Sequence, residues 1–160
     1  MARSARSAAA ADPNRVLMLT RSFAARRSRV FRAFTERDEV RQWFGPEGFT
    51  IAACAIDLRV GGAYRIVMRS PQGSEHIVRG VYQEISKPER LVFTWAWEDE
   101  EGDLGPETVV TVSFAENDGK TLVRLSHRRF ESKKARDAHK GGWAGALICL
   151  AEFLGRKKKA

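Results

Sequence analysis

The sequence has few cysteines and no long hydrophobic run. Its two cysteines, Cys54 and Cys149, form neither a CxxC pair nor a cluster with histidines, which argues against a zinc site and a disulfide scaffold. No apolar run approaches the ~20 residues of a membrane span. Residues 1–13 lack the apolar centre of a secretory signal. We therefore expect a cytoplasmic protein with reduced thiols, no metal and no cofactor.

Positive charge is concentrated in three segments of the chain. Of the net charge of +8, residues 128–140 and 156–159 carry +4 each and residues 1–13 carry +1, which leaves −1 for the rest. Basic residues interleaved with aromatic ones along one element are absent, so we expect no nucleic-acid partner. The length of 160 residues suits one domain. We predict a domain over residues 14–155, between a disordered tail (1–13) and a basic tail (156–160).

One long helix is predicted near the C-terminus. Trp143, Leu147, Leu150 and Leu154 recur at helical spacing. A helix over residues 135–154 would be about 30 Å long, enough to cross a small sheet.

The rest of the chain is predicted to be mostly strand. A first strand (15–22) precedes two short helices (25–34 and 38–44), with Asp38 as a candidate N-cap and Gly45-Pro46 ending the second helix. From Thr50 the apolar period changes to two, which predicts six antiparallel strands over residues 50–58, 63–69, 75–86, 90–97, 108–115 and 121–130. The predicted class is α+β, with a curved antiparallel sheet of about seven strands wrapped around the long helix.

Several short motifs carry a family resemblance. They are RSFAAR (21–26), VFRAF (30–34), WFGP (43–46), DLRVGG (57–62), GVY (80–82), PERLVFTW (88–95) and GWAGAL (142–147). In these motifs the chain resembles the START-like (SRPBCC) superfamily, and within it the Activator of heat-shock protein 90 ATPase homologue (Aha-type) family. The resemblance implies the helix-grip fold with a cavity between sheet and helix. It also implies binding of hydrophobic small molecules or co-chaperone activity, and no fixed set of catalytic residues.

The candidate site is this cavity. We expect it to bind a hydrophobic or amphipathic small molecule, with lining from Trp43, Tyr64, Trp95, His127, Trp143 and Leu147. Two purely structural alternatives stay open. In these, Trp43 and Phe44 fill one end of the core without touching a ligand, and His127 is a core histidine. A cyclase-, dehydratase- or hydrolase-type enzyme is a second hypothesis, in which His127 and Tyr64 or Glu84 move protons. Stress-related co-chaperone-like partner binding through the outer surface is a third.

Two surface features complete the predictions. The acidic loop 98–107 and the basic segment 128–140 fall at the same end of the sheet, where they form either surface ion pairs or a charged gate over the pocket mouth. Gly141, Gly145 and Ile148 lie away from the Trp143 stripe, which makes a homodimer through the outer side of the helix a further hypothesis.

Overall fold

The computed structural model describes residues 12–159 of the chain. The expected tail 1–13 lies outside the described part up to residue 11, and Pro13 begins a short 3-10 helix. No helix of the described part combines the length and the apolar composition that a membrane crossing requires.

The described residues form one antiparallel sheet and three α-helices. In chain order the elements are η1 (Pro13–Arg15), β1 (Val16–Phe23), α2 (Arg27–Thr35), α3 (Arg37–Trp43), β2 (Thr50–Ile56), β3 (Ala63–Arg69), β4 (Glu75–Ser86), β5 (Arg90–Glu98), β6 (Thr108–Asn117), β7 (Lys120–Arg128) and α4 (Lys133–Lys159). The seven strands follow the order β1-β7-β6-β5-β4-β3-β2, and each neighbouring pair is antiparallel. The predicted helix-grip architecture is thus confirmed.

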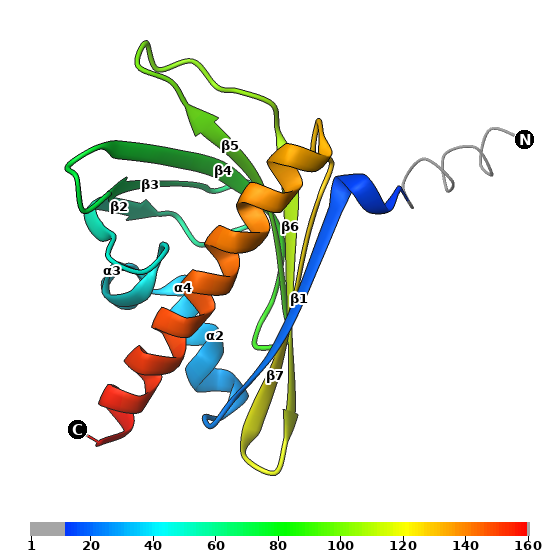
Figure 1. Cartoon of the computed structure of the whole chain (residues 1–160). Helices are drawn as coiled ribbons and strands as arrows, with labels where there is room; N and C mark the ends of the chain where they lie inside the picture. The colour runs from blue at the N-terminus through cyan, green and yellow to red at the C-terminus, as the bar shows by residue number, and fades with distance from the viewer. Residues whose placement is uncertain (1–11, 160) are drawn as a thin grey trace, which may run out of the picture.

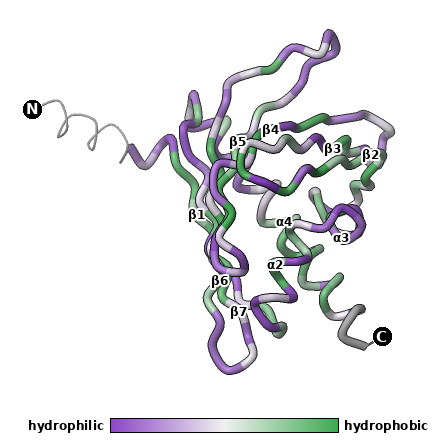
Figure 2. The backbone as a smooth tube through the Cα atoms, turned by 180° about the vertical axis from the view of Figure 1, so that it is seen from behind, coloured by the Kyte–Doolittle hydropathy of each residue, from purple (hydrophilic) through white to green (hydrophobic). Residues whose placement is uncertain are grey.

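The sheet curves around α4. Figure 1 shows α4 crossing the sheet, with α2 and α3 beside its C-terminal half, while strands β2 to β5 bend over its N-terminal half. Figure 2 shows the same arrangement from behind, with the hydrophilic β6–β7 turn projecting from one end of the sheet. The candidate site described below lies between these bent strands and α4 (Figure 1).

The predicted apolar stripe of α4 faces the sheet. Trp143, Leu147, Leu150 and Leu154 are all buried, and they join a core that includes Phe31 of α2 and Val110 of β6. This confirms that the long helix is part of the core. The core histidine, His127, lies on β7 opposite Val110.

Three local differences have physical causes. Helix α4 begins two residues earlier than predicted, because the hydroxyl of Ser132 accepts from the backbone N–H of Ala135 at 3.1 Å and caps the helix. It also continues past Leu154, where the sequence has no apolar residue to extend the pattern. The N-cap prediction for Asp38 is wrong: the cap position is Glu36, and Asp38 lies in the first turn of α3, where its charge favours the helix dipole.

A glycine allows the sheet to bend at β4 and β5. A Cβ atom on Gly80 would lie 1.9 Å from the backbone oxygen of Thr94, so any side chain at this position would push the two strands apart. The register between β4 and β5 shifts close by, between Tyr82 and Glu84, and such a bulge increases the local bend.

Candidate functional site: a cavity between the sheet and helix α4

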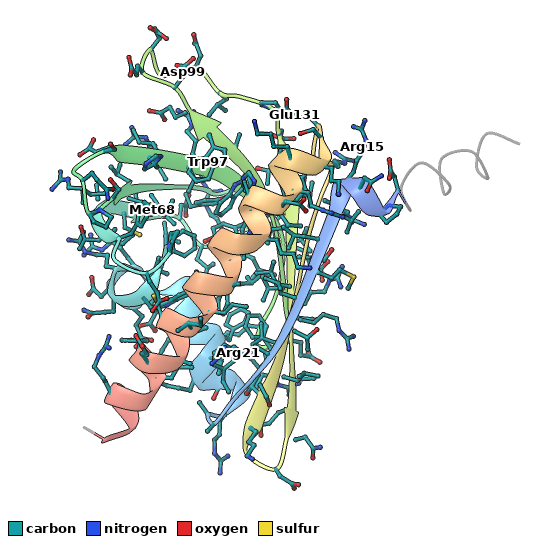
Figure 3. The ribbon with its side chains drawn as sticks, viewed as in Figure 1. Arg15, Arg21, Met68, Trp97, Asp99 and Glu131 are labelled. Carbon is teal, nitrogen blue, oxygen red and sulfur yellow. The ribbon has the colours of Figure 1, made fainter. Side chains whose placement is uncertain are left out.

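An apolar cavity of about 210 Å³ lies between the sheet and α4. The sheet wall comes from β3, β4 and β5 and consists of Met68, His76, Trp95 and Trp97. In Figure 3, Met68 and Trp97 lie on the bent strands beside α4. At about 30 Å³ per water molecule in the liquid, the space corresponds to about seven waters. A compact organic molecule fits such a volume.

The helix wall and a loop close the cavity. The helix contributes His139, Gly142, Trp143 and Ala146, and the segment 44–49 contributes two phenylalanine rings, Phe44 and Phe49. The walls are therefore almost wholly apolar. Their only titratable side chains are two histidines, so the cavity walls carry no Lys, Arg, Asp or Glu.

Two glycines of α4 face the segment 44–49. A Cβ atom on Gly145 would lie 3.5 Å from Pro46 Cα, and one on Gly142 would lie 4.0 Å from Pro46 Cγ. The segment itself turns at Gly45, whose φ of +104° suits glycine. The expectation that Gly145 lies on an outer face is thus corrected, because this glycine faces Pro46 within the same chain.

His127 is the centre of a buried hydrogen-bonded chain. Its side chain is 0% exposed. The indole N–H of Trp143 donates to Nδ1 at 3.1 Å, so Nδ1 carries no proton and Nε2 carries it. Nε2–H then donates to the hydroxyl of Thr108 at 2.7 Å, and this hydroxyl donates to the carbonyl of Trp95 at 3.0 Å.

Within this buried hydrogen-bonded chain, His127 is neutral. Burial, and then the neighbouring His139, lower the pKa of His127 from its ordinary 6.5 to about 2. Both ring nitrogens are engaged, and the side chain lines neither the cavity of 210 Å³ nor the smaller one described below. The arrangement favours a core histidine that positions Trp143 over a histidine that transfers protons.

His139 is a second positioning histidine, and it does line the cavity. The indole N–H of Trp97 donates to its Nε2 at 2.8 Å, so its other nitrogen, Nδ1, carries the proton and donates to the carbonyl of Ala135 at 2.8 Å. Trp97 and α4 are thereby joined across the cavity wall. His139 lies one helical turn before Trp143, a spacing that could have identified it from the sequence.

The remaining predicted lining residues lie elsewhere. Trp43 is buried and donates its indole N–H to the carbonyl of Ala33 at 2.9 Å, as expected for a plug of the core. Leu147 is buried and lines neither cavity.

Tyr64 donates its hydroxyl to the carbonyl of Thr94 at 2.5 Å and lines a second, smaller cavity of about 30 Å³. Burial raises the pKa of Tyr64. Of the six predicted residues, the main cavity brings together Trp95 and Trp143.

The three proton-transfer candidates are not brought together. Glu84 accepts from Arg90 at 3.2 Å and from Ser86 at 3.0 Å. Tyr64 lies in the smaller cavity, and His127 lines neither cavity. Among residues 12–159 there is also no group of three His, Cys, Asp or Glu side chains arranged to hold a metal ion.

The first acidic residue of loop 98–107 forms ion pairs with arginines of the neighbouring strands. Glu98 at the end of β5 accepts from Arg65 at 2.8 Å and from Arg79 at 3.2 Å. The bonds from Arg65, with a smaller contribution from those of Arg79, lower the pKa of the Glu98 carboxyl to about 2. Between the described side chains of loop 98–107 and segment 128–140 there is no ion pair. The alternative of surface ion pairs between these two segments is therefore wrong for the described residues, and the charged gate stays a prediction.

Comparison with known proteins agrees with this geometry. The family model of Activator of Hsp90 ATPase homolog 1-like protein matches residues 24–155. The chain belongs to this family. The match contains all the motifs quoted above except the start of RSFAAR, and it contains every residue of the main cavity.

Solved structures of other proteins share the fold. An AHSA1 protein from Silicibacter pomeroyi is 29% identical, with a TM-score of 0.80 over 89% of this chain and 99% of that chain. A protein from Nitrosomonas europaea is 25% identical, with a TM-score of 0.78 over 93% and 99% of the two chains. A protein from Chromobacterium violaceum is 27% identical, with a TM-score of 0.76 over 86% and 95%. None of the curated proteins matches this chain.

Proposed function

We propose that this protein binds a compact apolar small molecule between the sheet and α4. The observation that carries the proposal is the cavity of about 210 Å³ with almost wholly apolar walls. A preformed apolar pocket with few polar groups is the usual form of a small-molecule site. Its volume is below the range of about 300–1,000 Å³ that holds drug-sized ligands, so the expected ligand is smaller than a long-chain amphiphile.

Burial of apolar surface supplies the affinity. At ~25 cal/mol per Å², a ligand that buries on the order of 200 Å² gains about 5 kcal/mol before the costs of binding are subtracted. The expected affinity of a small probe is therefore weak. A natural ligand that also meets the polar groups of the wall would bind more tightly.

The test uses a probe molecule and a pair of neighbouring glycines. Gly142 lines the cavity, and a Cβ atom there meets nothing closer than Pro46 Cγ at 4.0 Å. Gly142→Leu therefore adds a side chain at the cavity wall. Gly141→Leu is the matched control, because Gly141 is exposed and a Cβ atom there meets nothing within 4 Å. Both variants make the same change in helix propensity.

Isothermal titration calorimetry with α-methylstyrene measures binding to the three proteins. We expect equal Kd values for the wild type and Gly141→Leu, and a Kd at least about tenfold higher for Gly142→Leu, which corresponds to 1.4 kcal/mol. Equal binding to all three proteins would place the probe outside the cavity. Absence of saturable binding to the wild type by this probe and by a panel of compact apolar molecules would refute the proposed function.

Two observations support small-molecule binding over the other two hypotheses. Neither nitrogen of His127 is free for proton transfer, and no specific surface observation favours the co-chaperone activity that the family name suggests, so we put small-molecule binding first. Cys54 and Cys149 are free cysteines, which suits a reducing compartment. A cytoplasmic location is part of the proposal.

A further inference from the structure

One of the four tryptophans differs from the others in its hydrogen bonding. The indole N–H groups of Trp43, Trp97 and Trp143 donate to Ala33, His139 and His127 at 2.9, 2.8 and 3.1 Å. The indole N–H of the fourth, Trp95, has no acceptor among the described residues. Trp95 is 5% exposed, and its nitrogen is out of contact with bulk water.

An unpaired donor at this position needs a physical reason. Burial of an N–H group without an acceptor forfeits the bonds it made to water in the unfolded chain, so buried donors are nearly always paired. Trp95 is otherwise well packed, with its ring 5.1 Å from that of Trp143 and 5.5 Å from that of His127. Neither neighbour offers an acceptor, because the Trp143 indole has none and both His127 nitrogens are engaged.

Trp95 is also one of three residues that line both cavities. Phe44, Trp95 and Trp143 line both the cavity of about 210 Å³ and the one of about 30 Å³. Phe44 belongs to the segment between α3 and β2, and its ring lies 6.1 Å from that of Trp95 and packs against the rings of Trp43 and Trp143. The Trp95 nitrogen itself has almost no accessible surface, so a bound molecule reaches the donor only after one of the neighbouring rings shifts.

We infer that the ligand is a neutral apolar molecule with one hydrogen-bond acceptor, such as a carbonyl oxygen, that accepts the N–H of Trp95. The inference rests on the proposed function and specifies its ligand class. A neutral acceptor fits better than a carboxylate, because the cavity walls hold no Lys or Arg and the ring nitrogens of His127 and His139 are all engaged by other partners. A buried anion without a cationic partner is strongly disfavoured.

The test compares two probes of one shape. Acetophenone has a carbonyl oxygen where α-methylstyrene has a methylene group, so the pair differs in the acceptor and hardly in size. In a ¹⁵N-labelled wild-type protein the four indole N–H signals are followed during titration with each probe. We expect the Trp95 signal to move downfield with acetophenone and not with α-methylstyrene, because a new hydrogen bond deshields the proton.

Calorimetry with two substitutions gives the second measurement. The ratio of the Kd of α-methylstyrene to the Kd of acetophenone should fall about 2- to 12-fold in Trp95→Phe, the range expected for one hydrogen bond. Trp43→Phe is the matched control: it removes an indole N–H that already has an acceptor and belongs to a residue that lines neither cavity, so the ratio should be unchanged. The ratio within one protein cancels any general loss of affinity.

The outcomes separate this inference from the proposed function. Binding of both probes with an unchanged ratio in Trp95→Phe, and no downfield shift of the Trp95 signal, would overturn the acceptor inference and leave the pocket intact. Failure of both probes and of the wider panel to bind the wild type would overturn the two together. If Trp95→Phe does not fold, the indole shifts of the wild type decide.

Discussion

The buried chain through His127 predicts that the stability of the protein falls with acid in a specific way. The pKa of His127 is 6.5 in the unfolded chain and about 2 in the folded one. Between these values the unfolded state binds a proton that the native state does not, so the free energy of unfolding decreases as the pH is lowered below 6.5. Well below pH 6.5 each further pH unit costs about 1.4 kcal/mol, so the loss from pH 6.5 to pH 4.5 is on the order of 2 kcal/mol.

His127→Gln isolates this contribution. Glutamine does not titrate, and its amide can still accept from Trp143 and donate to Thr108, the two partners of His127. Other groups titrate in both proteins, so the informative quantity is the difference between them. Urea denaturation of wild type and variant from pH 7 to pH 4.5 should show the wild type losing about 2–3 kcal/mol more than the variant, at unchanged m-values.

Parallel pH profiles of the two proteins would refute the reasoning. They would mean that His127 binds a proton in the folded state as readily as in the unfolded one. The tautomer derived from the Trp143 donor would then be wrong, because a protonated Nδ1 cannot accept that bond. The same result would reopen the hypothesis that His127 transfers protons.

Three further predictions concern packing and assembly. Trp143→Ala should lower the free energy of unfolding by about 3–5 kcal/mol, since it removes a buried indole and leaves the His127 acceptor unpaired; an unchanged denaturation midpoint would remove Trp143 from the core. Gly80→Ala should lower the Tm by at least about 4–8 °C, because its Cβ would lie 1.9 Å from the Thr94 oxygen, whereas Gly141→Ala, with open space around its Cβ, should not lower it. The homodimer hypothesis places Ile148, which is 36% exposed, in the dimer interface. Sedimentation velocity should then show a dimer for the wild type and monomers for Ile148→Glu. A monomeric wild type would contradict the hypothesis.

The fold could be predicted because each element has a period and a boundary signal. The stripe through Trp143 predicts α4. Asp118-Gly119 predicts the β6–β7 turn, where the φ values are +54° and +75°. The end of α4 could not be predicted, because residues after Leu154 have no apolar face to mark a helix.

The site could be predicted only in part, because periodicity gives the face of a side chain and not its depth along the element. Trp143 and Leu147 share one stripe of α4, yet only Trp143 reaches the cavity. Met68 shares a strand face with Tyr64, but the two line different cavities. The acceptors of the indole N–H groups depend on pairs such as Trp97 and His139, which are 42 positions apart in the chain. Such pairs have no local signal.

The most direct test of the central claim is a methyl NMR titration of the wild type. With ¹³C-methyl methionine, Met68 reports on the cavity, where it is 3% exposed, and Met18 reports on an outer surface, where it is 57% exposed. On titration with acetophenone, we expect the Met68 signal to shift saturably with the Kd found by calorimetry while the Met18 signal stays in place. A saturable shift of Met18 with an unchanged Met68 would show that the molecule binds the outer face, and would contradict the account.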